Sequence, residues 1–262
     1  MLCLALADAP RAAAAAPDTV FLEELTWTEV RDLVRAGKST IIVPIGGTEQ
    51  NGPHMALGKH NVRVKLLSAL VARGLGNALV APVIAYVPEG QLSPPSGHMR
   101  FPGTITVPDD VFQKVLEAAA RSFRAHGFRD IVFLGDHGST QAGQKAVAAR
   151  LNREWAGSPA RAHAIEEYYQ ASEEDLRRLL AARGYRREEL GTHAGLADTS
   201  LMLALDPGLV RLDRLRPGTG LGSNGDGVEG DPTRAAPELG RLGVEMIVPR
   251  TVEAIRKSIA QR

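Results

Sequence analysis

Histidine and carboxylate side chains gather in four glycine-rich loops of this 262-residue chain. Imidazole and carboxylate groups from separate loops can converge on one divalent cation, and such a mixed set suits Zn²⁺, Mn²⁺ or Fe²⁺. A lone loop histidine is usually a surface or hydrogen-bonding residue, but four such loops together favour a metal site. The loops are GGTEQNGPHMALGKHN with Glu49, His54 and His60; PPSGHMRFPGTI with His98; GDHGST with Asp136 and His137; and THAGLADTS with His193 and Asp198.

The elements that must position these loops alternate between short apolar runs and helical stretches. This alternation predicts an α/β fold, a three-layer α/β/α arrangement with a mostly parallel central sheet. Ligands bind such sheets at the carboxyl ends of the strands, where we expect most of the loops to lie. Strands are expected at Thr40–Ile45, Ala78–Ala81 and Asp130–Leu134, and helices at His60–Arg73, Asp109 or Asp110 to Ala125, Gln141–Glu154, Glu173–Ala182, Thr199–Ala204 and Thr233–Ile259. The last of these is expected to break at Pro237 and near Pro249.

Composition predicts one domain over residues 17–262 with a small molecule as its partner. Lys and Arg number 31 against 30 Asp and Glu, so no basic surplus argues for nucleic acid or an anionic membrane. No segment approaches the roughly 20 apolar residues that span a bilayer. The single cysteine, Cys3, excludes an internal disulfide and a thiolate cluster, so metal ligands must be His and carboxylate. Residues 1–16 match either a short export signal or a disordered N-terminus, which leaves cytoplasmic and exported locations open.

The loops resemble those of the creatininase family, which includes creatinine amidohydrolases and formamide hydrolases. That family shows a first loop like G-S-x-E-Q-H-G-P-H-L-P-L-x-T-D, and GTEQNGPHMALGKH keeps much of it in register. Its H-x-x-F-P-G-T-I loop is matched from His98, and GDHGST, HAGLADTS and GVEGDPTRA match three further segments in the same order. The resemblance implies the creatininase-like α/β fold, hydrolysis of a carbon–nitrogen bond other than a peptide bond, and a homo-oligomer such as a hexamer.

The departures from the family concern the metal ligands. In two-metal members one cation is held at the positions of Glu49, His60 and His137, and His60 replaces the bridging aspartate. The second cation uses the positions of Asn51, His60 and Ser139, where the anionic charge is lost. The resemblance therefore implies one divalent transition metal per chain, Zn, Mn or Fe, bound by Glu49, His60 and His137. Further candidate ligands are Asp136, Asn51, His54 and His98.

The expected activity is a metal-dependent amidohydrolase that cleaves a small linear or cyclic amide with metal-activated water. His193, which matches the family's H-A-G histidine, is expected to carry the proton to the leaving nitrogen. Asp198 is the second catalytic candidate, and it either orients a ligand histidine or caps the helix that follows. Alternatives are a lactone hydrolase or an Fe²⁺ enzyme on the same scaffold, or a non-catalytic protein that binds small molecules.

Overall fold

The computed structural model describes residues 17–261, so the expectation for residues 1–16 falls on residues outside this range. Its sheet has four strands in the order β2 (Ala78–Val80), β1 (Thr40–Ile45), β3 (Asp130–Gly135) and β4 (Arg161–Ala164). Every neighbouring pair is parallel, with Thr40 opposite Asp130 and Ile45 opposite Gly135. The expected α/β class is confirmed.

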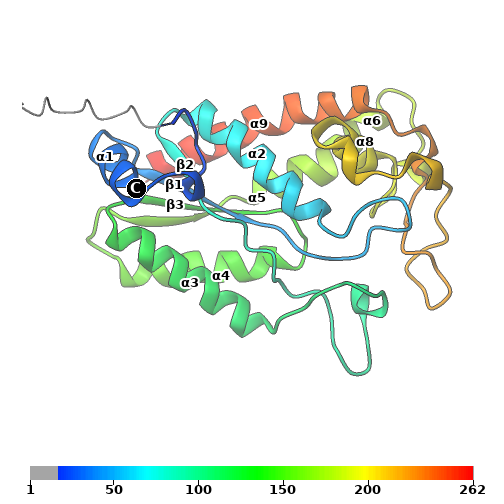
Figure 1. Ribbon diagram of the computed structural model, residues 1–262, viewed down its shortest axis with the longest axis horizontal. Coiled ribbons are helices and arrows are strands. Elements are labelled where there is room, and N and C mark those ends of the chain that lie inside the picture. The colour runs from blue at the N-terminus through cyan, green and yellow to red at the C-terminus, as the bar shows by residue number, and fades with distance from the viewer. Residues whose placement is uncertain (1–16, 262) are drawn as a thin grey trace, which may run out of the picture.

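Both faces of the sheet are buried, because successive side chains of a strand point to opposite sides. Ile42, Val132 and Leu134 pack in one core, and Ile41, Val43 and Phe133 pack in the other. The first core lies under α2 (Lys59–Leu75), α8 (Leu196–Leu205) and α9 (Pro237–Ala260), and the second under α3 (Asp109–Ala125) and α4 (Thr140–Glu154). Figure 1 shows the sheet between these two helical layers, as the three-layer prediction requires.

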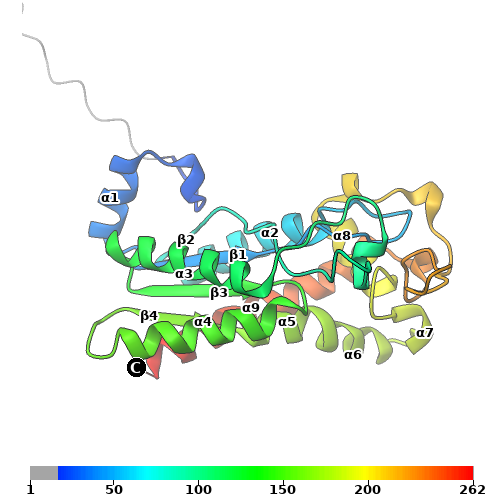
Figure 2. The same cartoon turned by 90° about the horizontal axis from the view of Figure 1, so that it is seen from below.

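Shorter helices complete the described part of the chain. A continuous helical run joins α5 (Glu166–Gln170), a π-helical segment (Ala171–Asp175) and α6 (Leu176–Ala181). Figure 2 shows α6 and α7 beyond the end of the sheet. The remaining elements are α1 (Trp27–Arg35), α7 (Arg187–Leu190) and 3₁₀ turns at Leu22–Glu24, Gly97–Arg100, Pro207–Leu209, Leu212–Arg214 and Pro232–Arg234. None of the described helices is long and apolar enough to cross a membrane.

The expected break near Pro249 is wrong, because α9 continues through this residue. Proline removes one backbone donor and leaves the carbonyl four residues earlier without its partner. Pro249 and Glu245 are both exposed, so water can satisfy that carbonyl. Buried residues on either side, Ile247 and Thr251, keep the helix packed. Pro237 instead forms the start of α9, where a missing donor carries no penalty.

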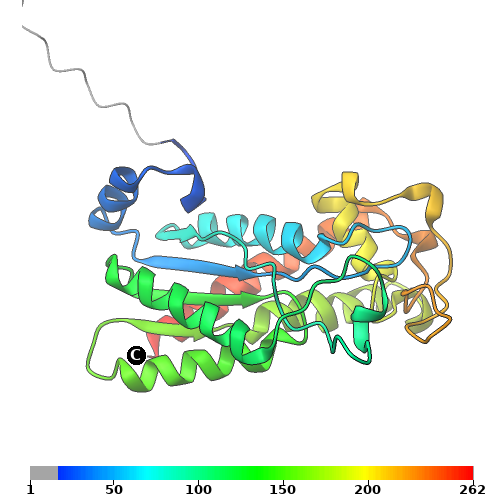
Figure 3. The ribbon, with the colours of Figure 1, turned by 60° about the horizontal axis from the view of Figure 1, so that its bottom comes forward.

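The parallel strands bring several loops to one edge of the sheet. The chain leaves β1 and β3 at their carboxyl ends, and the long segment after β2 reaches the same side of the molecule (Figure 3). The turn that precedes α8 comes to this region from the helical layer. Residues far apart in the sequence therefore meet beyond the strand ends.

Candidate metal centre

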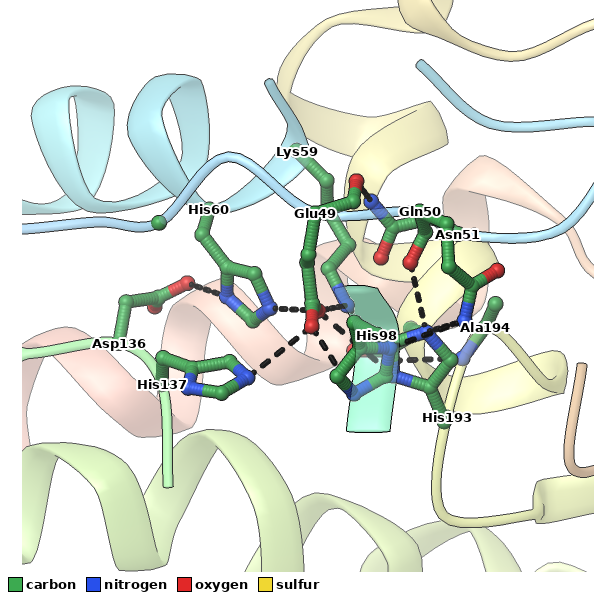
Figure 4. A network of polar contacts seen from close by, with 12 residues as sticks. Glu49, Gln50, Asn51, Lys59, His60, His98, Asp136, His137, His193 and Ala194 are labelled. Atoms are coloured by element: carbon green, nitrogen blue, oxygen red, sulfur yellow. Dashed lines mark hydrogen bonds and ion pairs between the residues drawn. The ribbon is translucent and has the colours of Figure 1, made fainter. Parts of the chain in front are cut away.

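The buried carboxylate of Glu49 lies at the centre of the site, in the loop that follows β1. Its Oε1 is 2.7 Å from Nε2 of His60, and its Oε2 is 3.0 Å from Nε2 of both His98 and His137. Nδ1 of His193 lies 3.7 Å from Oε1. Figure 4 shows His60 and His137 on one side of this carboxylate and His98 and His193 on the other. Four of the histidines that the sequence analysis names therefore surround the Glu49 carboxylate.

The groups around Glu49 keep its carboxylate ionised. Burial alone would raise the pKa of Glu49, but the positive charge of His60 and hydrogen bonds from His137 and His60 hold it well below the usual range. The same contact with Glu49 raises the pKa of His137 against the opposing effect of burial. Glu49 is therefore an ionised oxygen donor in a site of low solvent exposure.

Four residues offer ligand atoms that all lie within 4.8 Å of one another: Glu49, Glu89, His98 and His137. Glu89 had not been singled out from the sequence. Both of its side-chain oxygens are buried without a hydrogen-bond partner, and Oε2 is 3.3 Å from Nε2 of His137. Burial, opposed by His137, raises the pKa of Glu89 to about 8. Besides the imidazole of His137, no group pairs with this buried carboxyl among the described residues, and the mixed set of two carboxyl groups and two imidazoles fits a divalent metal.

The backbone at Gly47 makes room for Glu89. A Cβ at Gly47 would lie 2.8 Å from Oε1 of Glu89, closer than carbon and oxygen can approach, and the residue has a φ of 157°. A side chain there would displace the carboxylate. The second glycine of the GGT sequence therefore belongs to the site.

His137 is oriented through its second ring nitrogen. Ser139 Oγ donates to the carbonyl of Pro88 at 2.6 Å and lies 2.7 Å from Nδ1 of His137, so it accepts a hydrogen bond from the N–H at that nitrogen. Nε2 is then left to face Glu49 and Glu89, as is usual for a ligand histidine held by a second group. Ser139 therefore positions the ring of His137.

His60 has both ring nitrogens in contact with carboxylates. Nδ1 is 2.7 Å from Oδ2 of Asp136, and Nε2 is 2.7 Å from Oε1 of Glu49. To bind a metal, as predicted, Nε2 would have to exchange the Glu49 contact for the cation. Asp136 also accepts from Nε of Arg63 at 2.8 Å and from the Tyr168 hydroxyl. Because these bonds hold the carboxylate in place, it fixes the orientation of the His60 ring.

Asp198 forms its hydrogen bonds with two cations and with the backbone before α8. Oδ1 accepts from Nη1 of Arg63 at 2.6 Å, and Oδ2 accepts from Nζ of Lys59 at 3.2 Å. Oδ2 also accepts from the N–H of Ala194 at 2.9 Å, which holds the turn before α8. Among the described residues, Ala194 is the non-glycine residue with a positive φ, at 54°. Such strained backbone is typical of functional sites, and here it directs the neighbouring His193 inward.

His193 is a neutral imidazole with one nitrogen facing the cavity. Nε2 lies 2.9 Å from the carbonyl of Gln50 and 3.1 Å from the side-chain amide nitrogen of the same residue, and Nδ1 is directed towards Glu49. Burial and the positive charge of Lys59 lower the pKa of His193 to about 3. This residue is therefore uncharged at neutral pH, and Nδ1 is a weak base.

Two candidates from the first loop lie outside the cluster of ligand atoms. Nδ2 of Asn51 donates to the carbonyls of Glu49 and Ala56, so the side chain holds the shape of its own loop. Nε2 of His54 is 3.0 Å from the hydroxyl of Thr199, which packs this histidine against α8.

Known proteins match most of this chain in sequence. The family model described as creatininase, creatinine amidohydrolase, matches residues 23–255. A creatinine amidohydrolase of Pseudomonas putida is 32% identical over 75% of this chain and 76% of its own length. A mycofactocin precursor peptide peptidase of Mycolicibacterium smegmatis is 28% identical over 79% of this chain and 81% of its own length.

Solved structures of similar proteins share this fold. A crystal structure of a creatinine amidohydrolase is 27% identical, with a TM-score of 0.76 over 93% of this chain and 99% of the other. A creatininase variant described as the Zn-Zn type is 28% identical, with a TM-score of 0.75 over 93% of this chain and 99% of the other.

The geometry predicts that Glu89 contributes to metal affinity. We expect Glu89→Gln to weaken Zn²⁺ binding by more than about 10-fold, because the variant loses an anionic donor next to His137. Calorimetric titration of the metal-free protein with Zn²⁺ measures this effect. Glu229→Gln is the matched control, since Glu229 is exposed at the rim of the same cavity. Equal Zn²⁺ affinities for the two variants would contradict a ligand role for Glu89.

Proposed function

The chain belongs to the creatininase family of hydrolases, and from this premise we propose that it is an amidohydrolase that uses one divalent metal ion. The observation that carries the proposal is the convergence of two carboxylates and two imidazoles, Glu49, Glu89, His98 and His137, at the carboxyl edge of the sheet. Such a donor set suits Zn²⁺, Mn²⁺ or Fe²⁺.

A single metal is proposed because the positions of the second one have other roles. Asn51 bonds to backbone carbonyls, Ser139 holds His137, and His60 lies between Glu49 and Asp136. None of the three adds a free anionic oxygen. The solved Zn-Zn creatininase thus differs from the arrangement proposed here.

The cavity supports a small substrate or the end of a longer one. Its volume is about 190 Å³, below the range of roughly 300–1,000 Å³ found for drug-sized ligands. Thr192 and Glu229 line both this cavity and a neighbouring surface pocket of about 670 Å³. The shared rim favours a peptide-like substrate as the second candidate, since a longer chain could extend into the outer pocket.

Each residue of the site has a separate role in the proposed reaction. Glu49, Glu89, His98 and His137 would hold the metal, which when bound supplies a Lewis acid and lowers the pKa of water. His60, fixed by Asp136, keeps the Glu49 carboxylate in place. His193 takes the proton of the attacking water on Nδ1 and passes it to the leaving nitrogen as the carbon–nitrogen bond breaks.

Metal loading and a substrate panel test the proposed function. We expect close to one transition metal per chain by elemental analysis, and hydrolysis of at least one amide that a chelator abolishes and Zn²⁺ or Mn²⁺ restores. The panel contains creatinine, formamides, cyclic imides, short peptides and lactones. Two tightly bound metals per chain, or hydrolysis of lactones alone, would refute the proposal.

The role of His193 is tested separately from metal binding. We expect His193→Gln to keep its metal and to lower kcat by about 10²–10⁴-fold, the usual contribution of general acid–base catalysis. His126→Gln, at an exposed histidine, is the control and should match the parent. If His193→Gln is purified without metal, the residue is a ligand; if it keeps metal and normal kcat, it is structural.

Homo-oligomer formation remains a prediction from the family resemblance. We expect light scattering to give a mass that is a multiple of the 28.0 kDa chain. A stable monomer across micromolar concentrations would contradict it.

A further inference from the structure

Lys59 is a buried cation at the wall of the proposed active site, and the proposed chemistry has not yet used it. It is the first residue of α2, is 1% exposed, and lines the cavity together with Glu49 and the site histidines. Nζ lies 3.2 Å from Oδ2 of Asp198 and 3.8 Å from Oε1 of Glu49. Figure 4 shows the side chain extending from the helix towards the Glu49 carboxylate.

The position of Lys59 is unfavourable by itself. Removing an ammonium group from water costs several kcal/mol unless other groups compensate. A positive charge at a helix N-terminus also opposes the helix dipole. The carboxylates of Asp198 and Glu49 offset these costs, but they do not explain why a cation occupies this place.

Asp198 would stay paired without Lys59. Its Oδ1 accepts from Nη1 of Arg63 at 2.6 Å, and its Oδ2 accepts from the N–H of Ala194 at 2.9 Å. Among the described residues, the ammonium forms one side-chain hydrogen bond, to Asp198, although it carries three donors. Its remaining donors are therefore free for a group inside the cavity.

An ammonium with free donors in a buried cavity binds an anionic oxygen strongly, because little water screens the charge. Resting on the amide hydrolysis proposed above, we propose that Lys59 binds the substrate carbonyl oxygen as it becomes negative. The water oxygen forms a bond to the carbonyl carbon, and the π electron pair moves onto the oxygen that Lys59 contacts. The electron pair on that oxygen then re-forms the carbonyl as the carbon–nitrogen bond breaks, and His193 gives the leaving nitrogen the proton it took from the water. The carboxylic acid passes its remaining proton to the released amine, which leaves the product carboxylate on Lys59.

The inference also accounts for the loss of the second metal position. With Asn51, His60 and Ser139 committed to other contacts, Lys59 supplies a second positive charge beside Glu49. A covalently attached cation needs no ligands of its own. The site then combines one metal with one ammonium.

Substitution at Lys59, with acetate as the probe for the product carboxylate, tests this role. We expect metal-loaded Lys59→Met to keep its metal, to bind acetate at least 10-fold more weakly in calorimetric titration, and to lower kcat by about 10²–10³-fold, the range for losing one oxyanion donor. Lys65→Met is the matched control, because Lys65 lies on the same helix but pairs with Glu23 at the surface. It should bind acetate and turn over substrate like the parent.

Lys59→Gln provides a second variant that can still donate to Asp198, so a folding defect of the Met variant does not end the test. If either variant folds with its metal and retains parental acetate affinity and kcat, Lys59 is only a charge-neutralising residue and the inference is overturned. If the parent hydrolyses no amide, yet acetate binding still depends on Lys59, the proposed function fails while the anion site stands.

Discussion

The burial of the Glu49 carboxylate is the constraint on which the rest of the site depends. An ionised acid with no solvent exposure is stable only if donors or cations surround it. The parallel sheet meets this requirement, because the loops leaving neighbouring strands converge at the same edge. His137 comes from the loop after β3 and His60 from the first turn of α2, so the environment of one carboxylate fixes the relative positions of two layers.

A network of ion pairs centred on Arg63 holds the residues around Glu49 in place. Arg63 is fully buried, and it binds Asp136 from the end of β3, Asp198 from α8 and Glu173 from the π-helical segment. The pKa of Arg63 is raised well above its ordinary value, because these three carboxylates outweigh the effect of burial. Since a buried ion pair adds little net stability but is costly to break, the network specifies geometry more than it adds to stability. It orients His60 through Asp136 and the Ala194 turn through Asp198.

The sequence predicted the layers and the central acid because both depend on local patterns. The apolar runs of β1 and β3 are buried on both faces, and the loops after them carry Glu49 and His137. Glu89 could not be found in this way, because it lies nine residues after the last residue of β2, in a segment without regular structure. Lys59 did leave a signal, since a lysine in the first turn of a helix opposes the dipole. Helix α1 was missed although Thr26 and Glu29 form a capping box, and α9 passes Pro249 because solvent reaches the freed carbonyl.

The charges of the site are consistent with the single metal proposed above. Glu49 comes from the loop after β1, and Glu89 brings a second carboxylate from a different loop. Burial raises the pKa of Glu89 to about 8, and a divalent cation nearby would favour its ionised form. A single divalent ion at Glu49 and Glu89 would then balance two carboxylates, while Lys59 faces the opposite side of Glu49 from His137. The proposed scheme thus places two positive charges beside Glu49, one from the metal and one from Lys59.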